Sequence, residues 1–429
     1  MSAYDWSRPA LTPVLPGPQD IGPLKDMAQA VAVASAGLEK SLPRETSREL
    51  GRCLRLVNSY YSNLIEGHKT TIPEIEQALD QRYAEHPGRR YAQELCAAHV
   101  RVEQELMDGL AGRPGLDVCA PGYIRGIHRR FYALLPGEHH FTHHSGGFTD
   151  VPVMAGTLRD GEVSLDNRTP HGPPPAKLPG LMQEFARSFD PDAHHGDERL
   201  IAAAVSHHRL AWLHPFRDGN GRVARLHTSL LLARHRVNTG NLWSLSRGFS
   251  RNKQGYMLNL NATDSPGEPG QGTFFHQGLT ADFCRFFFEI CLDQISFMDG
   301  LLDLKEVEAR IEWMVEDLIR TDLPKLASEA SRLVRSVFRG GSPAGGRPSQ
   351  VRDPPRPPDH GPAGRSPALY LSESVRSERY RSGIPGDRLN FLGADSGQRI
   401  FIEQVRGHVH SAHYSRQPHE PDQGTRPYP

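Results

Sequence analysis

The sequence of 429 residues contains no uninterrupted run of about 18 apolar residues, the length that a membrane-spanning helix needs. Its first residues carry prolines and charges where a secretory signal would need a continuous apolar stretch. Its five cysteines are irregularly spaced and include no close pair of the kind that builds a zinc or redox site. These absences predict a cytoplasmic protein with no membrane partner and with reduced, buried thiols.

An excess of charge of one sign is lacking as well, because 50 Lys and Arg residues balance 50 Asp and Glu residues. The composition therefore gives no argument for nucleic acid as a partner, and any affinity for phosphate groups must come from a local cluster. Hydrophobic residues make up 37% of the chain, which is enough for a sizeable core but not for the burial of every segment.

Apolar residues recur at helical spacing over residues 26–110, around 121–135, and again from 178 to about 338. The exception is the segment 145–166, where the runs FTDVPVMAG and EVSLD flank the turn residues LRDG. These short runs predict a β-hairpin around Val151 to Val163. The fold class is therefore mainly α, with one small hairpin.

The chain is predicted to have four parts. Residues 1–115 form an N-terminal helical region, 116–300 a catalytic core, and 301–338 a C-terminal helical extension. Residues 339–429 are rich in Pro, Gly and Arg and show no periodicity. Such a tail buries too little apolar surface to offset its chain entropy, so we expect it to be disordered.

The chemistry is concentrated in the segment 198–237, where two apolar helices are separated by the sequence HPFRDGN. Pro215 prevents the first helix from continuing, so the chain must turn at His214. The second helix is predicted to begin near Asn220 or Gly221. A glycine-rich loop before a helix points backbone N–H groups and the positive end of the helix dipole outward, which is typical of an anion site.

Arg222 and Arg225 support this interpretation, because arginines in the first turns of a helix are unfavourable unless an anion lies beside them. Their spacing allows both guanidinium groups to grip a polyphosphate by forked hydrogen bonds. Asp218 offers a hard carboxylate for Mg²⁺ (or Mn²⁺) next to those phosphates. His214 has the side chain best suited to take a proton from a hydroxyl near neutral pH.

The sequence HPFRDGNGR, from His214 to Arg222, resembles the signature of the Fic (filamentation induced by cAMP) family, and Arg225 matches its extended form. The resemblance covers roughly residues 45 to 300 and implies a Fic-type helical bundle with a small β-hairpin flap. It implies a protein adenylyltransferase that moves AMP from ATP to a Ser, Thr or Tyr hydroxyl of a target protein. His214 would be the base and Asp218 the metal ligand. The residues implied to bind the nucleotide are Phe216, Gly219, Asn220, Gly221, Arg222 and Arg225.

Two further features follow from the same resemblance. The hairpin would be the family's flap, which binds the backbone of the target by strand addition, with Val151, Val153 and Met154 as the target contacts. Many relatives carry an Arg after the aromatic residue at the start of the flap, whereas Thr149 follows Phe148 here. Gly221 resembles the adenylyl-transferring branch of the family, because the kinase-like branch has a Lys at this position.

The sequence SNLIEG resembles the inhibitory motif of the family, with Ser62, Glu66 and Gly67 at its fixed positions. The resemblance implies that Glu66 pairs with Arg225 and occupies the space of the γ-phosphate of ATP. From the residues alone, the alternative is an ordinary helix end at Gly67 with a solvated Glu66.

Other functions stay open at this stage. They are UMP transfer, removal of AMP, a permanently inhibited ATP-binding protein, and a transcription-linked nucleotide-binding regulator. No helix-turn-helix pattern follows Leu333, so nucleic acid is not an expected partner. Arg251 and Tyr256 are weaker candidates for lining the nucleotide, and a homodimer is compatible with the sequence.

The many histidines suggest a metal site as a further alternative. Only His207 and His208 share a predicted helix, and adjacent helical residues do not face the same way. The remaining members of the set are His139, His140, His143, His144, His194 and His195.

Overall fold

The computed structural model describes residues 4–5, 7–144, 147–163, 172–268, 270 and 272–302. The predicted disordered tail, and all but the first two residues of the predicted 301–338 extension, lie outside these ranges. The described α-helices are α1 (Pro18–Lys40), α2 (Arg44–Ile65), α3 (Ile72–Leu79), α4 (Pro87–Gly112), α5 (Pro121–Ala133), α6 (Leu178–Ser188), α7 (Glu198–Leu213), α8 (Asn220–Arg234), α9 (Leu245–Arg251), α10 (Lys253–Thr263) and α11 (Gln277–Leu301). Two strands and two 3₁₀ turns complete the set: β1 (Phe141–His144), β2 (Gly147–Pro152), η1 (Gly137–His139) and η2 (Pro175–Lys177). The prediction of a mainly α fold with one small hairpin is confirmed.

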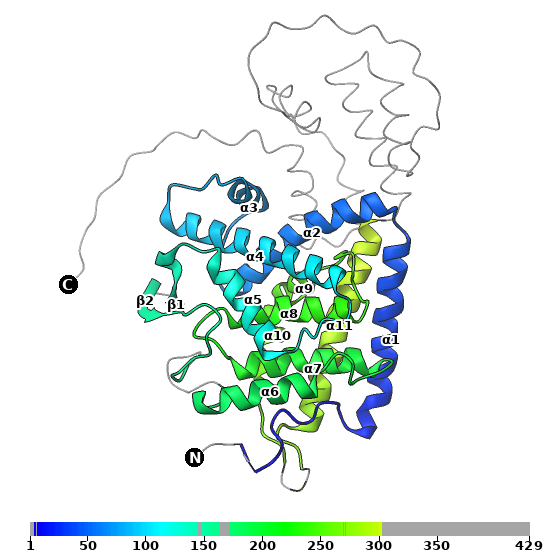
Figure 1. Ribbon diagram of the computed structural model, residues 1–429. Helices are drawn as coiled ribbons and strands as arrows, with labels where there is room; N and C mark the ends of the chain where they lie inside the picture. The colour runs from blue at the N-terminus through cyan, green and yellow to red at the C-terminus, as the bar shows by residue number, and fades with distance from the viewer. Residues whose placement is uncertain are drawn as a thin grey trace, which may run out of the picture. The chain divides into compact units, whose positions relative to one another are not determined.

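Helices α7 and α8 lie at the centre of the helical assembly (Figure 1). Every residue of α7 from Leu200 to Leu210 is buried, and α7 packs against α8, α11, α1 and α6. The sequence predicts this, because α7 is apolar on nearly all sides. None of the described helices is long and apolar enough to cross a membrane.

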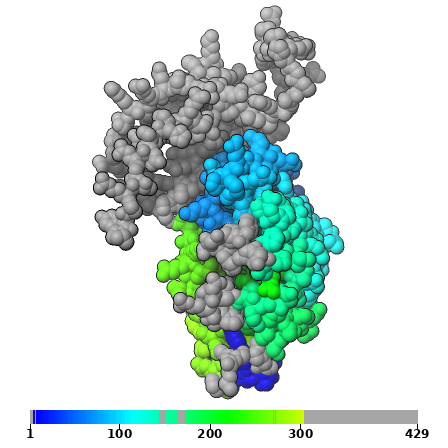
Figure 2. Space-filling model, turned by 90° about the vertical axis from the view of Figure 1, so that its left-hand side faces the viewer, coloured from blue at the N-terminus to red at the C-terminus, as the bar shows by residue number. Residues whose placement is uncertain are grey.

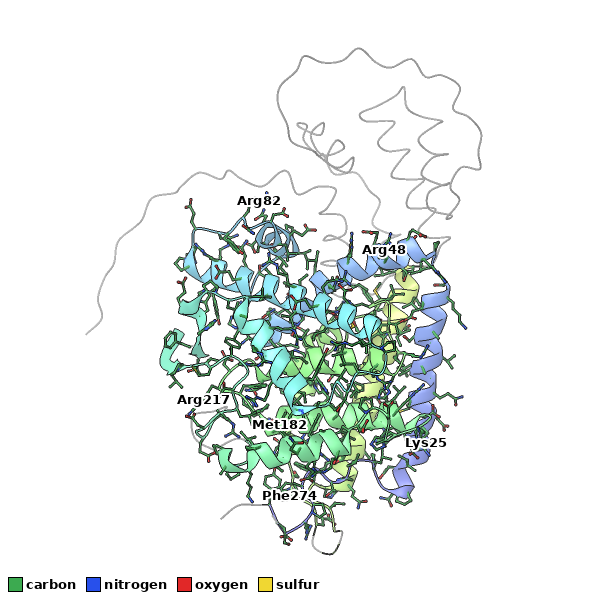
Figure 3. The ribbon with its side chains drawn as sticks, viewed as in Figure 1. Lys25, Arg48, Arg82, Met182, Arg217 and Phe274 are labelled. Carbon is green, nitrogen blue, oxygen red and sulfur yellow. The ribbon has the colours of Figure 1, made fainter. Side chains whose placement is uncertain are left out.

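The N-terminal helices cover this centre. Helix α1 packs along α11, which is more than 200 residues away in the sequence (Figure 1). Helix α2 packs against α4 and α9. An ion pair of 2.8 Å joins Lys25 of α1, labelled in Figure 3, to Glu198 at the start of α7. The packing brings the end of α2 close to the start of α8, which positions the candidate site.

The hairpin does not lie where the sequence predicted it. Strand β2 pairs antiparallel with β1, which precedes it, and His144 is the register partner of Gly147. Glu162 and Val163, at the start of the predicted second strand EVSLD, are not in a strand. Pro152 has no N–H group to continue the ladder, so β2 ends there and does not extend toward EVSLD.

The segment before α1 is anchored by one buried cation. The side chain of Arg209 in α7 is fully buried and donates hydrogen bonds to the carbonyl oxygens of Leu11 and Pro13, at 3.1 and 3.2 Å, and to the Thr280 hydroxyl. Its guanidinium lies 3.9 Å from the centre of the Phe275 ring, where the cation is attracted by the π electrons. Burial lowers the pKa of Arg209 to about 9.

We predict that Arg209→Met lowers the free energy of unfolding by about 3 kcal/mol, because it leaves several buried acceptors without a donor. Urea unfolding followed by circular dichroism would measure the change. The control is Arg285→Met, which removes a half-exposed arginine from α11 and should cost less than about 0.5 kcal/mol. Equal effects of the two substitutions would contradict the anchoring role of Arg209.

Candidate active site

His214 occupies the turn between α7 and α8. Its backbone is in the left-handed region, with φ 44° and ψ 58°, an uncommon conformation for a residue with a Cβ atom. Pro215 forces this turn, since the helix cannot continue through it. The structure therefore confirms the predicted break at His214 and the start of the second helix at Asn220.

The loop from His214 to Gly219 is closed by the side chain of Asn220. Its Oδ1 accepts the N–H of Phe216 and its Nδ2 donates to the carbonyl of Phe216, both at 2.8 Å. The Phe216 ring is completely buried. Of the residues predicted to bind nucleotide, these two side chains are therefore turned inward and support the loop.

His128 of α5 packs against this loop, and the sequence did not predict it as a site residue. Its ring stacks on Phe216 with centroids 4.0 Å apart. Its Nδ1 accepts the N–H of Gly156 at 2.8 Å, so Nε2 carries the proton and donates to the carbonyl of Asp218 at 3.2 Å. Burial lowers the pKa of His128 to about 3, so the ring is neutral at physiological pH.

The start of α8 carries the predicted anion-binding groups. The N–H of Gly219 donates to Oδ1 of Asp218 at 2.5 Å, so this amide is already engaged. Arg222 is buried and forms one ion pair with Asp218, at 3.4 Å. Its Nε and Nη1 atoms are buried without a hydrogen bond among the described residues. A guanidinium with unused donors at a helix N-terminus is suited to phosphate oxygens.

Arg225 joins this helix to the end of α2. Its Nε donates to the hydroxyl of Ser62 at 2.8 Å, and its Nη2 donates to the Ser62 carbonyl at 2.8 Å and to Oε1 of Glu66 at 2.5 Å. Arg225 is almost fully buried, whereas the Glu66 side chain is 33% exposed. The predicted pairing of Glu66 with Arg225 is thus present in the structure.

The Glu66 carboxylate also lies against the first turn of α8. A Cβ atom added at Gly221 would lie 2.3 Å from Oε1 of Glu66 and 3.0 Å from Nη1 of Arg225. A larger residue at this position would force the carboxylate to move from its place in the structure. Glu66 therefore occupies the anion-binding end of α8.

The helix end predicted as the alternative is present too. Gly67 has φ +92°, and the N–H of His68 donates to the carbonyl of Asn63, as expected for a glycine that terminates a helix. Lys253 donates to the carbonyl of Ile65 at 2.6 Å and so supports the same terminus. The helix end and the ion pair are compatible, because this termination directs Glu66 toward α8 rather than toward solvent.

The central part of the chain is similar to known proteins. Residues 120–232 match the family model described as Fic/DOC family. This segment is therefore similar to proteins of that family. The matched segment extends from α5 through the hairpin and α7 into α8, so it includes the loop from His214 to Arg222 but not Glu66.

Curated relatives match part of the chain. The chain is 26% identical over 175 residues to the protein adenylyltransferase Fic of Drosophila mojavensis, covering 41% of this chain and 31% of the relative. It is 29% identical over 178 residues to the protein of the same name from Nematostella vectensis, covering 41% and 36%. The match thus spans about a third of the length of these relatives. A Fic domain containing signaling protein from Bacteroides thetaiotaomicron aligns at 18% identity with a TM-score of 0.49, over 63% of this chain and 95% of that one.

The hairpin lies on the face shown in Figure 2. Val151 is 38% exposed and Met154 is 63% exposed. Val153 is only 2% exposed, and its N–H donates to the carbonyl of His140. The Val153 side chain therefore anchors the end of the hairpin to the core, and the predicted contact of this residue with a target stays a prediction.

Two other predicted candidates differ in their surroundings: Tyr256 interacts with Arg225 and Glu66, whereas Arg251 lies at the surface. Tyr256 of α10 is buried, and its hydroxyl lies 2.8 Å from Nε2 of His207. Arg251 is exposed at the end of α9. His208 contacts Asp264 instead, so the adjacent histidines face different partners. No group of three or more His, Cys, Asp or Glu side chains in the described ranges is arranged to hold a metal ion.

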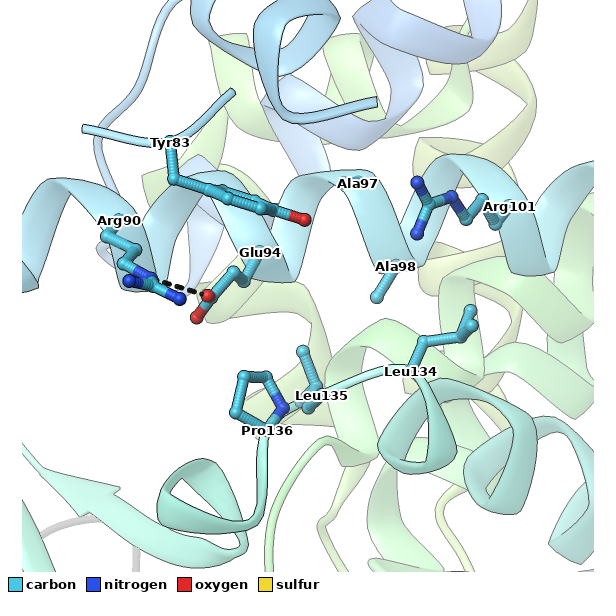
Figure 4. Close-up of a pocket in the computed structure, with 9 residues that line it drawn as sticks. All are labelled: Tyr83, Arg90, Glu94, Ala97, Ala98, Arg101, Leu134, Leu135 and Pro136. Carbon is cyan, nitrogen blue, oxygen red and sulfur yellow. Dashed lines mark hydrogen bonds and ion pairs between the residues drawn. The ribbon is translucent and has the colours of Figure 1, made fainter. Parts of the chain in front are cut away.

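A cavity of about 260 Å³ lies between α4 and the end of α5, and Figure 4 shows Glu94 paired with Arg90 at its edge. Glu94 also contacts Nε2 of His139, just before β1, at 2.6 Å. The lining includes no residue of the His214–Arg222 loop. This cavity is therefore separate from the candidate active site.

We predict a pH-dependent contribution of Glu66 to stability. Burial opposes ionisation of this carboxyl, but the guanidinium groups of Arg225 and Arg222 outweigh it and hold its pKa below the usual value. The stabilisation is therefore fully present at neutral pH and is lost only as the pH falls through the lowered pKa. Because a third of the side chain is exposed, we expect Glu66→Gln to cost about 1 kcal/mol at pH 7.

The measurement is the difference in urea unfolding free energy between wild type and Glu66→Gln at pH 7 and at pH 3. The difference should shrink at pH 3, while Glu49→Gln, a control on the exposed side of α2, should show no comparable change. A difference that is constant with pH would contradict the ionised pair.

Proposed function

We propose that this chain is a protein adenylyltransferase that transfers AMP from ATP to a hydroxyl side chain of a target protein, and that Glu66 holds it in an inhibited state. The observation that carries the proposal is the placement of His214 at one end of a loop whose other end is an anion site with two buried arginines. The match to the Fic/DOC family and the names of the curated relatives support the same reaction.

In the proposed reaction, the neutral imidazole of His214 takes the proton of the target hydroxyl. The hydroxyl oxygen then bonds to the α-phosphorus of ATP. The bond from that phosphorus to the bridging oxygen breaks, and pyrophosphate leaves with the electron pair. The protein contributes mainly positioning and neutralisation of charge.

The phosphates would bind at the start of α8. The N–H groups of Asn220 and Gly221 lie in its first turn, where amides have no partner within the helix. Arg222 would add its unused Nε and Nη1 donors. Gly219 contributes less than the sequence suggested, since its N–H is directed at Asp218.

Asp218 is the residue that would hold Mg²⁺ or Mn²⁺. Its carboxylate lies beside the first turn of α8 and retains 24% exposure, so it can reach an ion as well as Arg222. Mg²⁺ usually binds one or two carboxylates together with substrate phosphates and water, and Asp218 fits this pattern. The ion would neutralise charge on the phosphates, and Asp218 would fix its place.

The inhibited state follows from the position of the Glu66 carboxylate. It neutralises Arg225 and lies against Gly221, where the γ-phosphate of a productively bound ATP would need the same contacts. ATP would then bind with its phosphates displaced, and the α-phosphorus would not be in line with the attacking oxygen. Small displacements of this kind are costly in rate.

The target would bind beside the hairpin. Strand β2 has β1 on one side, and Val151 and Met154 are exposed at and just beyond its end. An extended segment of the target could add to this edge through backbone hydrogen bonds. The exposed apolar pair would then contact the side chains that flank the modified hydroxyl.

We predict that Glu66→Gly retains label from [α-³²P]ATP on protein and none from [γ-³²P]ATP, because the α-phosphoryl group is transferred and pyrophosphate leaves. Labelling should exceed that of wild type by about 100-fold or more. The readout is incorporation of label into the protein itself, followed by gel electrophoresis.

Two variants serve as controls for this experiment. The double variant Glu66→Gly with His214→Ala should lose transfer by about 10² to 10⁴-fold, because the general base is absent. Arg225→Ala should not show the gain, since it removes the phosphate ligand together with the partner of Glu66. Retention of the γ label would indicate a kinase. Equal labelling by wild type and Glu66→Gly would contradict the proposal that Glu66 inhibits the protein.

A further inference from the structure

Arg159 lies outside both sequence motifs and makes four hydrogen bonds to backbone carbonyls. Its Nε donates to the carbonyl of His214 at 2.7 Å, and its own backbone N–H donates to the carbonyl of Pro215 at 2.9 Å. Its Nη1 and Nη2 donate to the carbonyls of Gly161 and Pro173, at 3.1 and 2.6 Å. One residue thus holds both backbone carbonyls at the turn that carries the base.

The surroundings of Arg159 show that this arrangement is specific. The residue is 3% exposed, and among the described residues no carboxylate forms an ion pair with it. Burying a guanidinium is costly unless its donors are satisfied, which the three carbonyl acceptors achieve, and the charge of Glu162 also favours the cation. The cation also lies beside the C-terminus of α7, where the helix dipole favours positive charge.

Gly172 completes this clamp. It has φ +77°, and a Cβ atom added there would lie 2.5 Å from the carbonyl oxygen of Trp212. A glycine therefore allows the backbone at 172–173 to pass against the last turn of α7, where the Pro173 carbonyl meets Arg159. Three chain segments converge on one guanidinium at the end of this helix.

We propose that Arg159 is a positioning residue for the proposed transfer reaction, which sets the backbone of His214 so that its imidazole is presented at the rim of the site. His214 is in an uncommon left-handed conformation, and such a conformation persists only where the surroundings enforce it. Asn220 holds the loop at Phe216, and Arg159 holds it at His214 and Pro215. Arg159 acts through the backbone of His214 and does not touch the reacting groups.

The first measurement does not depend on the proposed function. Hydrogen–deuterium exchange of the amides of His214 and residues 216–219 should be about tenfold faster in Arg159→Gln than in wild type, while exchange in the middle of α7 stays the same. Arg159→Lys, which keeps one donor and the charge, should give an intermediate rate. The control is Arg234→Gln, which removes another arginine bonded to a carbonyl but remote from the loop. Unchanged exchange at 214–219 would overturn the proposal.

The second measurement rests on the proposed function and uses the Glu66→Gly background. Adding Arg159→Gln should lower kcat about 100-fold and leave KM for ATP within about twofold, because the base is displaced while the phosphate site at α8 is intact. Adding Arg159→Lys should restore part of kcat. A parallel loss of kcat, ATP affinity and melting temperature in both variants would mean a merely structural role and overturn the proposal. If Glu66→Gly itself transfers no AMP, the proposed function fails and the exchange data alone decide the role of Arg159.

Discussion

The ion pair between Glu66 and Arg225 is the contact on which the organisation of the site depends. Arg225 is buried in α8, and a buried guanidinium requires acceptors. Ser62 and Glu66, both at the end of α2, supply them. The same guanidinium and the first turn of α8 would attract a polyphosphate. In the proposed function, the Glu66 carboxylate at the end of α2 would therefore compete with the phosphates of ATP for the Arg225 guanidinium.

The loop that carries His214, the proposed base, is held by a different set of contacts. Pro215 imposes the turn, and the side chain of Asn220 closes the loop by hydrogen bonds to the backbone of Phe216. The neutral imidazole of His128, from α5, donates a hydrogen bond to the carbonyl of Asp218 in the loop. None of these bonds involves Glu66. Displacement of Glu66 would therefore leave the loop that presents His214 unchanged. In the proposed inhibited state, the proposed base His214 would already be in place, and only the phosphates of ATP would lack their correct position.

The sequence was most informative where covalent geometry and charge act locally. Pro215 determined the break before α8, and the spacing of Arg222 and Arg225 indicated the anion site. The hairpin was misplaced because several short β-rich runs compete for one partner, and the choice depends on tertiary contacts such as that of Val153 with the core. His128 lies on the same face of α5 as Ile124 and Phe131, so its place in the sequence pattern is that of an ordinary core residue. Arg159 gave no signal, since its role depends on carbonyls that only the folded chain brings together.

Competition for the anion site can be tested without a nucleoside or a target. Inorganic triphosphate with Mg²⁺ has the charge and oxygen atoms of the ATP phosphates, and isothermal titration calorimetry at pH 7.5 would give its Kd for wild type and for Glu66→Gly. If the Glu66 carboxylate occupies the phosphate position, the variant should bind triphosphate at least about tenfold more tightly than wild type, a difference of about 1.4 kcal/mol. Equal affinities of two folded proteins would show that Glu66 does not compete with phosphate, and would contradict the central role assigned to its pairing with Arg225.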